Sequence, residues 1–118
     1  MPKNILIVDD NVTLRENLKE LLNKKGYEVK IAGENEEIWR VIKENTFDLM
    51  ILDLILPDKN TSVILGGLKC ACPNMRIVIY SGYEEYEKSP YIRQADAFLS
   101  KSKGPEVLIS TIENLLAK

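Results

Sequence analysis

Five short apolar runs recur along the chain, separated by longer stretches that mix polar and apolar residues. Each run has the length of a β-strand. Four of them are apolar almost throughout, which is typical of parallel strands covered on both faces, whereas the second alternates polar and apolar positions. The runs predict strands at residues 4–9, 27–32, 48–53, 76–81 and 96–100.

The stretches between and after these runs repeat apolar residues at helical spacing. In the first stretch the leucines at 14, 18, 21 and 22 fall on one face, and Gly26 follows where a helix should end. The third predicted helix is weakened by two glycines, and the fourth is interrupted by Pro90. The predicted helices span residues 11–25, 35–44, 61–69, 84–94 and 105–118.

Strands that alternate with helices predict an α/β fold. We expect a doubly wound five-stranded parallel sheet with helices on both faces. The chain has 118 residues, which is the size of one compact domain, and we place that domain at residues 1–118.

Composition narrows the classes of function. The net charge is −2 and the chain has no basic run, so we expect neither direct nucleic-acid binding nor attraction to an anionic membrane. No apolar stretch approaches the roughly 18–20 residues of a membrane span, and no export signal is visible, so we expect a cytoplasmic protein. Cys70 and Cys72 read as two reduced thiols near a loop.

The chain contains no histidine. This excludes a nucleophile activated by a histidine of the same chain, as in Ser-His-Asp or Cys-His systems. If phosphohistidine chemistry is involved, the histidine must belong to a partner.

The residues that end the predicted strands carry the candidate chemistry. In an open parallel sheet, ligands bind beyond the carboxyl ends of the strands. Three carboxylates, a hydroxyl and an ammonium should gather there, and they belong to Asp9, Asp10, Asp53, Ser81 and Lys101. Neighbouring carboxylates repel, and a hard cation such as Mg²⁺ offsets that repulsion. Taken singly, Asp9 or Asp10 could equally cap a helix, Ser81 could be a turn residue, and Lys101 could be a solvated lysine.

Four stretches in register resemble the response-regulator receiver domain of two-component signal transduction. They are ILIVDDN (residues 5–11), DLMILDLILPD (48–58), IVIYSGY (77–83) and DAFLSK (96–101). The resemblance covers nearly the whole chain and implies a flavodoxin-like strand order 2-1-3-4-5. It also implies a switch that is phosphorylated by a partner histidine kinase or phosphotransfer protein and then alters its binding to a downstream protein target.

The resemblance assigns the acceptor and the metal ligands. Asp53 resembles the phosphoacceptor aspartate, with Pro57 four residues later. Asp10 resembles a direct Mg²⁺ ligand, Asp9 a residue that acts mainly through water, and the backbone carbonyl of Ile55 a further ligand.

The resemblance also assigns residues that respond to phosphorylation. Ser81 resembles the switch hydroxyl that hydrogen-bonds the phosphoryl group, and Gly82 the small residue that leaves access open. Phe98 resembles the rotating switch aromatic, and Lys101 the lysine that pairs with the acceptor or its phosphoryl group. Tyr83, with Ile55, would flank the site where water attacks.

Three positions depart from the family pattern. Ser102 follows the lysine where proline is usual, so we expect a trans peptide and a differently shaped loop there. Thr61 replaces a common glycine. The segment between Ser81 and Lys101 is about two residues shorter than usual, which puts the fourth helix and the usual output face in doubt.

Two other readings stay open. One is an aspartate-nucleophile phosphatase of the haloacid-dehalogenase type, whose D-x-D-x-T motif is faintly echoed by residues 9–13, although Asn11 replaces the second aspartate. The other is a binding module that keeps the receiver fold and signals without phosphorylation.

Overall fold

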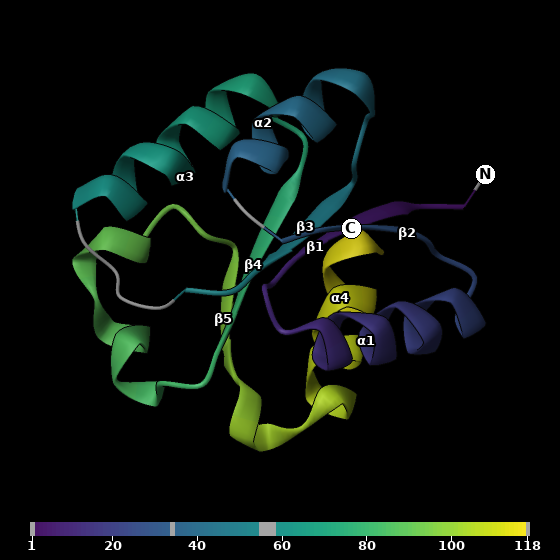
Figure 1. Cartoon of the computed structure of the whole chain (residues 1–118). Helices are drawn as coiled ribbons and strands as arrows, with labels where there is room; N and C mark the ends of the chain where they lie inside the picture. Colours follow the sequence, from purple (N-terminus) through teal and green to yellow (C-terminus); the bar gives the residue numbers. More distant parts are fainter. Residues whose placement is uncertain (1, 34, 55–58, 118) are drawn as a thin grey trace.

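The computed structural model of the chain describes residues 2–33, 35–54 and 59–117 (Figure 1). Within them, five parallel strands form one sheet in the order β2-β1-β3-β4-β5, which confirms the predicted fold and strand order. No helix in the described part of the chain is long and apolar enough to cross a bilayer. The strands are β1 Asn4–Val8, β2 Glu28–Ala32, β3 Leu49–Leu52, β4 Arg76–Ser81 and β5 Ala97–Ser100. The α-helices are α1 Val12–Lys24, α2 Asn35–Glu44, α3 Lys59–Ala71 and α4 Pro105–Leu116.

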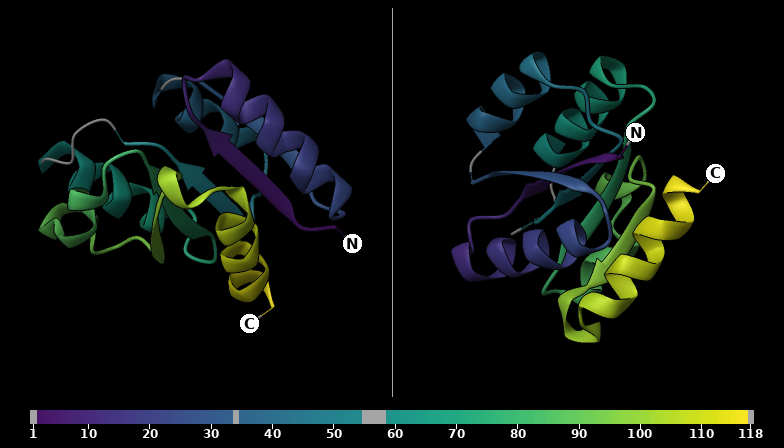
Figure 2. Two further views of the ribbon diagram at one scale, coloured as in Figure 1. Left: turned by 90° about the horizontal axis from the view of Figure 1, so that it is seen from below. Right: turned by 90° about the vertical axis from the view of Figure 1, so that its right-hand side faces the viewer.

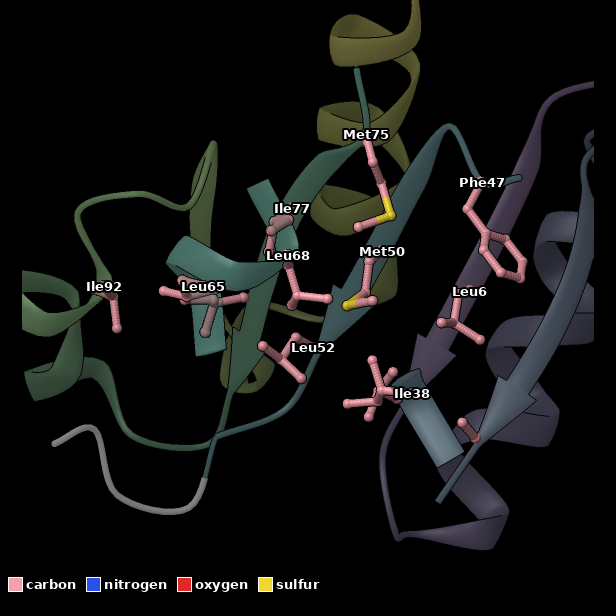
Figure 3. Close-up of a cluster of buried hydrophobic side chains, with 13 residues drawn as sticks. Leu6, Ile38, Phe47, Met50, Leu52, Leu65, Leu68, Met75, Ile77 and Ile92 are labelled. Carbon is pink, nitrogen blue, oxygen red and sulfur yellow. The ribbon is translucent and has the colours of Figure 1, made fainter. Parts of the chain in front are cut away.

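Helices cover the sheet on both faces (Figures 1 and 2). Side chains alternate across a strand, so odd and even positions of β1 enter different cores. Leu6 and Val8 pack in the core beneath α2 and α3, where Figure 3 draws Leu6 among its neighbours. Ile5 and Ile7 pack in the core beneath α1 and α4. The three central strands β1, β3 and β4 are almost wholly buried, which explains their near-continuous apolar runs.

The third helix is longer than predicted, although it contains two glycines. α3 spans 13 residues, from Lys59 to Ala71, instead of residues 61–69. A Cβ atom at Gly67 would lie 3.1 Å from Cη2 of Trp39 on α2, which is a tight contact. Gly67 therefore allows the Trp39 ring to lie close to α3, and this tertiary packing offsets the low helix propensity of glycine.

The predicted helix over residues 84–94 is not an α-helix. Two short 3₁₀ helices replace it, η1 Glu84–Lys88 and η2 Pro90–Ile92. Pro90 disfavours the helical conformation at the residue before it, and Ser89 accordingly has an extended backbone with ψ of 133°. The break in the helix is thus where the sequence indicated, but neither half is α-helical.

Aspartates at the amino edge of the sheet form hydrogen bonds to the neighbouring strands. Asp48 and Asp96, predicted as first residues of strands, lie just before β3 and β5. The Asp48 carboxylate accepts a hydrogen bond from the Asn4 N–H at 2.8 Å, and Asp96 accepts one from the Ile77 N–H at 2.7 Å. Each aspartate N–H also donates to the carbonyl of the same partner residue. The pairs therefore fix the register of β1 against β3 and of β4 against β5.

The Asp96 carboxylate is held further by Lys69 at 2.7 Å and Arg76 at 3.5 Å. Burial alone would raise the pKa of Asp96. The hydrogen bonds from Lys69 and the Ile77 N–H, with the charges of Lys69 and Arg76, outweigh burial and hold this pKa below its ordinary value.

Replacing Asp96 with Asn tests this anchor. We expect Asp96→Asn to lower the free energy of unfolding near pH 7 by about 1–3 kcal/mol, because charged hydrogen bonds are lost. A carboxyl whose folded pKa is lowered stabilises the fold above its unfolded value near 3.8, and that contribution disappears as pH falls through the folded value. The difference between variant and wild type in urea titrations should therefore shrink below pH 4. A Glu87→Gln control, at an exposed carboxylate, should change little, and a pH-independent loss in Asp96→Asn would contradict the assignment.

Candidate functional site

Three aspartates converge at the carboxyl edge of the sheet. One carboxylate oxygen from each of Asp9, Asp10 and Asp53 lies within 4.8 Å of the others. Asp9 and Asp53 were predicted as the last residues of strands, but they lie just beyond β1 and β3. Because β1 and β3 are neighbours, their ends bring together residues that are far apart in the sequence. We call these three residues the acidic triad.

The turn between β1 and α1 fixes the orientation of Asp9. The Asn11 N–H donates to Asp9 Oδ1 at 2.9 Å, and Arg15 Nη1 donates to the Asp9 carbonyl at 3.3 Å. Asn11 Oδ1 accepts a hydrogen bond from the Leu14 N–H at 3.1 Å and so caps α1. The cap is therefore Asn11, which leaves the carboxylates of Asp9 and Asp10 available to the site. Sequence reasoning missed the roles of Asn11 and Arg15.

Lys101 joins the acidic triad from the end of β5. Its Nζ lies 2.9 Å from Asp9 Oδ2 and 3.2 Å from Asp53 Oδ1. Burial lowers the pKa of Lys101, but the hydrogen bond with Asp9 and the charges of Asp53 and Asp9 outweigh it, so the pKa lies above its ordinary value. Lys101 is therefore a fixed positive charge between two carboxylates.

The three carboxylates of the acidic triad carry more negative charge than the Lys101 ammonium group can balance. Burial raises the pKa of Asp53, and the negative charges of Asp9 and Asp10 raise it further against the opposing effect of Lys101. Asp9 is only 5% exposed and Asp53 is half-buried, so water screens these charges incompletely. Clustered carboxylate oxygens are the ligands that Mg²⁺ prefers, and the donor set fits such a cation.

Ser81 ends β4 beside this edge and is fully buried. Its Oγ donates to the Leu54 carbonyl at a long 3.5 Å and accepts from the Tyr83 N–H at 3.2 Å. Tyr83 itself is half exposed. The structure thus places Ser81 at the predicted edge, with its hydroxyl proton held by a weak bond.

Phe98 is partly buried and lies opposite Ile79 in the β4–β5 ladder. It packs against the core beneath α2 and α3. Gly82 is exposed, and a Cβ atom there would meet nothing within 4 Å. Ile55 and Pro57, predicted as a metal ligand and a loop residue, lie outside the described residues.

Residues outside the acidic triad can also be compared with the structure. Among the described residues no peptide bond is cis, as expected for Ser102 after Lys101. Thr61 is buried at the start of α3. Cys70 and Cys72 are free thiols, as predicted.

Comparison with known proteins places this arrangement in a family. The family model described as "Response regulator receiver domain" matches residues 5–113. The DNA-binding transcriptional regulator NtrC of a Bradyrhizobium species is 30% identical over 117 residues, which cover 98% of this chain but 24% of that protein. The sporulation initiation phosphotransferase F of Bacillus subtilis is 32% identical over 87 residues, or 74% of this chain and 70% of the relative. The chain thus spans about a quarter of the length of the NtrC protein.

Solved structures give the same result. The response regulator TrrA of Thermotoga maritima, in complex with Mg²⁺ and BeF, superposes with a TM-score of 0.84 at 30% identity, covering 96% of this chain and 98% of TrrA. A CheY-like response regulator receiver domain protein of Methanospirillum hungatei gives 0.85 at 33% identity, covering 98% and 94%. With the strand order and the acidic edge described above, these matches show that the chain belongs to the response regulator receiver domain family.

Proposed function

We propose that the chain is a phosphorylation-dependent signalling switch in which Asp53 accepts a phosphoryl group from the phosphohistidine of a partner histidine kinase or phosphotransfer protein. The observation that carries the proposal is the half-buried Asp53 carboxylate, which lies among the acidic triad and 3.2 Å from Lys101. TrrA, a similar protein, has been crystallised with Mg²⁺ and BeF and in complex with the histidine kinase ThkA, which supports both the metal and the partner.

The acidic triad is the proposed metal site. Asp10 and Asp53 would bind Mg²⁺ directly, Asp9 would act mainly through water, and the carbonyl of Ile55 would be a further ligand. Bound there, Mg²⁺ supplies positive charge that offsets the charge on the phosphoryl oxygens during transfer.

Asp53 is the proposed nucleophile. One of its carboxylate oxygens attacks phosphorus in line, and a P–O bond forms as the P–N bond of the phosphohistidine breaks. The electron pair of the broken bond stays on the imidazole nitrogen of the partner.

Lys101 and Ser81 are the proposed donors to the phosphoryl group. Lys101 already contacts Asp53 and needs only to shift toward the new oxygens. Ser81 gives up a 3.5 Å hydrogen bond to Leu54 and so loses little when its hydroxyl turns toward the phosphoryl group. These contacts exist in the phosphorylated state alone, so they favour that state's conformation.

The downstream change is proposed to pass through Phe98. As Ser81 moves, Phe98 turns inward, and the surface over β4 and β5 changes its affinity for a protein target. Tyr83, half exposed beside Ser81, would influence the attack of water on the acyl phosphate. Residues 1–118 would act as a single receiver unit.

Phosphorylation of Asp53 can be tested directly. Treatment with acetyl phosphate and Mg²⁺ should give the wild-type chain a slower band in Phos-tag electrophoresis, and hydroxylamine should remove it, because it cleaves acyl phosphates. Asp53→Asn keeps the size of the side chain but lacks the nucleophilic oxygen, so it should show no slower band. Glu85→Gln, at an exposed carboxylate outside the triad, should behave like wild type.

Two outcomes of this experiment would end the proposal. One is a wild-type chain that does not shift, and another is an Asp53→Asn chain that shifts equally. Unchanged amide spectra after addition of beryllofluoride, a phosphoryl mimic, would favour a binding module that signals without phosphorylation. Steady turnover of a small phosphate ester would favour the phosphatase reading.

If Mg²⁺ binds the acidic triad, it should compete with the Lys101 ammonium group for the same carboxylates. Lys101→Met leaves buried Asp9 without its cation and should lower the free energy of unfolding by about 1–3 kcal/mol without metal. Mg²⁺ should stabilise this variant more than wild type, since the cation meets less competing positive charge and binds more tightly. Denaturant titrations with and without Mg²⁺ measure both increments. Lys103→Met removes an exposed charge from the same turn and should match wild type, so equal Mg²⁺ increments in all three proteins would refute the site.

A further inference from the structure

The turn that carries Lys101 is closed by serine side chains. β5 runs into a short 3₁₀ helix, η3 Lys101–Lys103, which we call the lysine turn. Ser100 Oγ caps it by accepting a hydrogen bond from the Ser102 N–H at 3.2 Å. The oxygens of the two serine hydroxyls lie 2.7 Å apart. The backbone beside Lys101 is therefore held by the side chains on either side of it.

Ser102 extends this network to another loop. Its Oγ donates to Glu84 Oε1 at 2.9 Å. An ionised carboxylate can only accept, so the single hydroxyl proton of Ser102 points at Glu84 and the Ser100 hydroxyl donates to Ser102 Oγ. The two serine hydroxyls thus donate in the same direction, toward the Glu84 carboxylate. The negative charge of this acceptor strengthens both hydrogen bonds.

Glu84 lies three residues after Ser81, in a segment that we call the serine turn (residues 81–84). Within it the Tyr83 N–H donates to Ser81 Oγ, and Glu84 begins η1. The bond between Ser102 and Glu84 therefore links the lysine turn to the serine turn. These two turns carry Lys101 and Ser81, both proposed donors to the phosphoryl group.

Proline at position 102 would abolish this link. A proline has no N–H for Ser100 Oγ and no hydroxyl for Glu84. In this chain, hydrogen bonds through Ser102 hold the turn in place of the stiffness that a proline ring provides.

We propose that Ser102 and Glu84 are positioning residues for phosphoryl transfer. Their hydrogen bond, here named the tether, holds Lys101 in place and makes the lysine turn and the serine turn move together. This inference rests on the proposed function of Asp53, because the tether acts through Lys101 and Ser81 and touches neither the triad nor the phosphoryl group.

The kinetic test is a double-mutant cycle with acetyl phosphate and Mg²⁺. Ser102→Ala and Glu84→Ala should each slow phosphorylation of the chain by roughly three- to tenfold, the factor that one ordinary hydrogen bond corresponds to. The double variant should be no slower than either single variant, because both changes break the same bond. Ser102→Thr keeps the hydroxyl and should retain most of the wild-type rate. Glu85→Ala removes an equal charge from the same 3₁₀ helix and should match wild type.

A second measurement tests the contact without any reaction. In amide NMR spectra of the unphosphorylated chain, Glu84→Ala should shift the resonances of Ser102 and Lys103, although these residues lie far along the sequence. It should also speed hydrogen exchange at the Ser102 N–H, whereas Glu85→Ala should do neither. Thermal melts of all variants show whether slower phosphorylation merely reflects unfolding, and matched melting temperatures are expected because both side chains of the tether are exposed.

The results of these experiments distinguish failure of the tether from failure of the proposed phosphorylation of Asp53. If wild type is not phosphorylated, the function of Asp53 fails. If wild type is phosphorylated but the variants react equally fast, or the rate losses in the double variant multiply, the tether is overturned alone. It is also overturned if Glu85→Ala slows the reaction as much as Glu84→Ala, or if Ser102→Thr is as slow as Ser102→Ala.

Discussion

The ion pairs of Lys101 with Asp9 and Asp53 connect the ends of three strands at one point. Asp9 follows β1, Asp53 follows β3 and Lys101 follows β5, so a single ammonium group links the carboxyl ends of β1, β3 and β5. Asp9 is nearly fully buried, and a buried carboxylate without a cation is strongly destabilising. Lys101 therefore stabilises this edge of the fold, and the same ion pairs hold it next to the proposed nucleophile.

The sheet and its acidic edge were predictable because both follow from short-range patterns. Apolar runs mark parallel strands, and the residues at the carboxyl end of each run must lie at the carboxyl edge of the sheet whatever the details of side-chain packing. Asp9, Asp53, Ser81 and Lys101 each occupy such a position, and the structure places them there. Their spatial convergence needed only the strand order, which the resemblance supplied.

The remaining features depend on contacts between distant side chains, which no local pattern encodes. α3 continues through Gly67, where the Trp39 ring of α2 packs closely, and this is a contact between two helices. The cap of α1 is Asn11 rather than either aspartate, and the choice depends on where the Asp9 carboxylate is held. The bond from Ser102 to Glu84 spans 18 residues, and the sequence indicated only that proline was missing. Pro90 predicted an interruption of the helix, but it did not predict that the segments on both sides would be 3₁₀ helices.

Phosphorylation of Asp53 would add negative charge to an edge that already has too little positive charge. The new phosphoryl oxygens would then compete with buried Asp9 for Lys101, which contacts both carboxylates. The central strands beneath the site are close-packed, because nearly every residue of β1, β3 and β4 is buried. Backbone movement should therefore cost least at the ends of the strands and in the turns that follow them. The serine turn and the lysine turn are joined through Glu84 and Ser102, so a displacement of one is transmitted to the other without passing through the sheet.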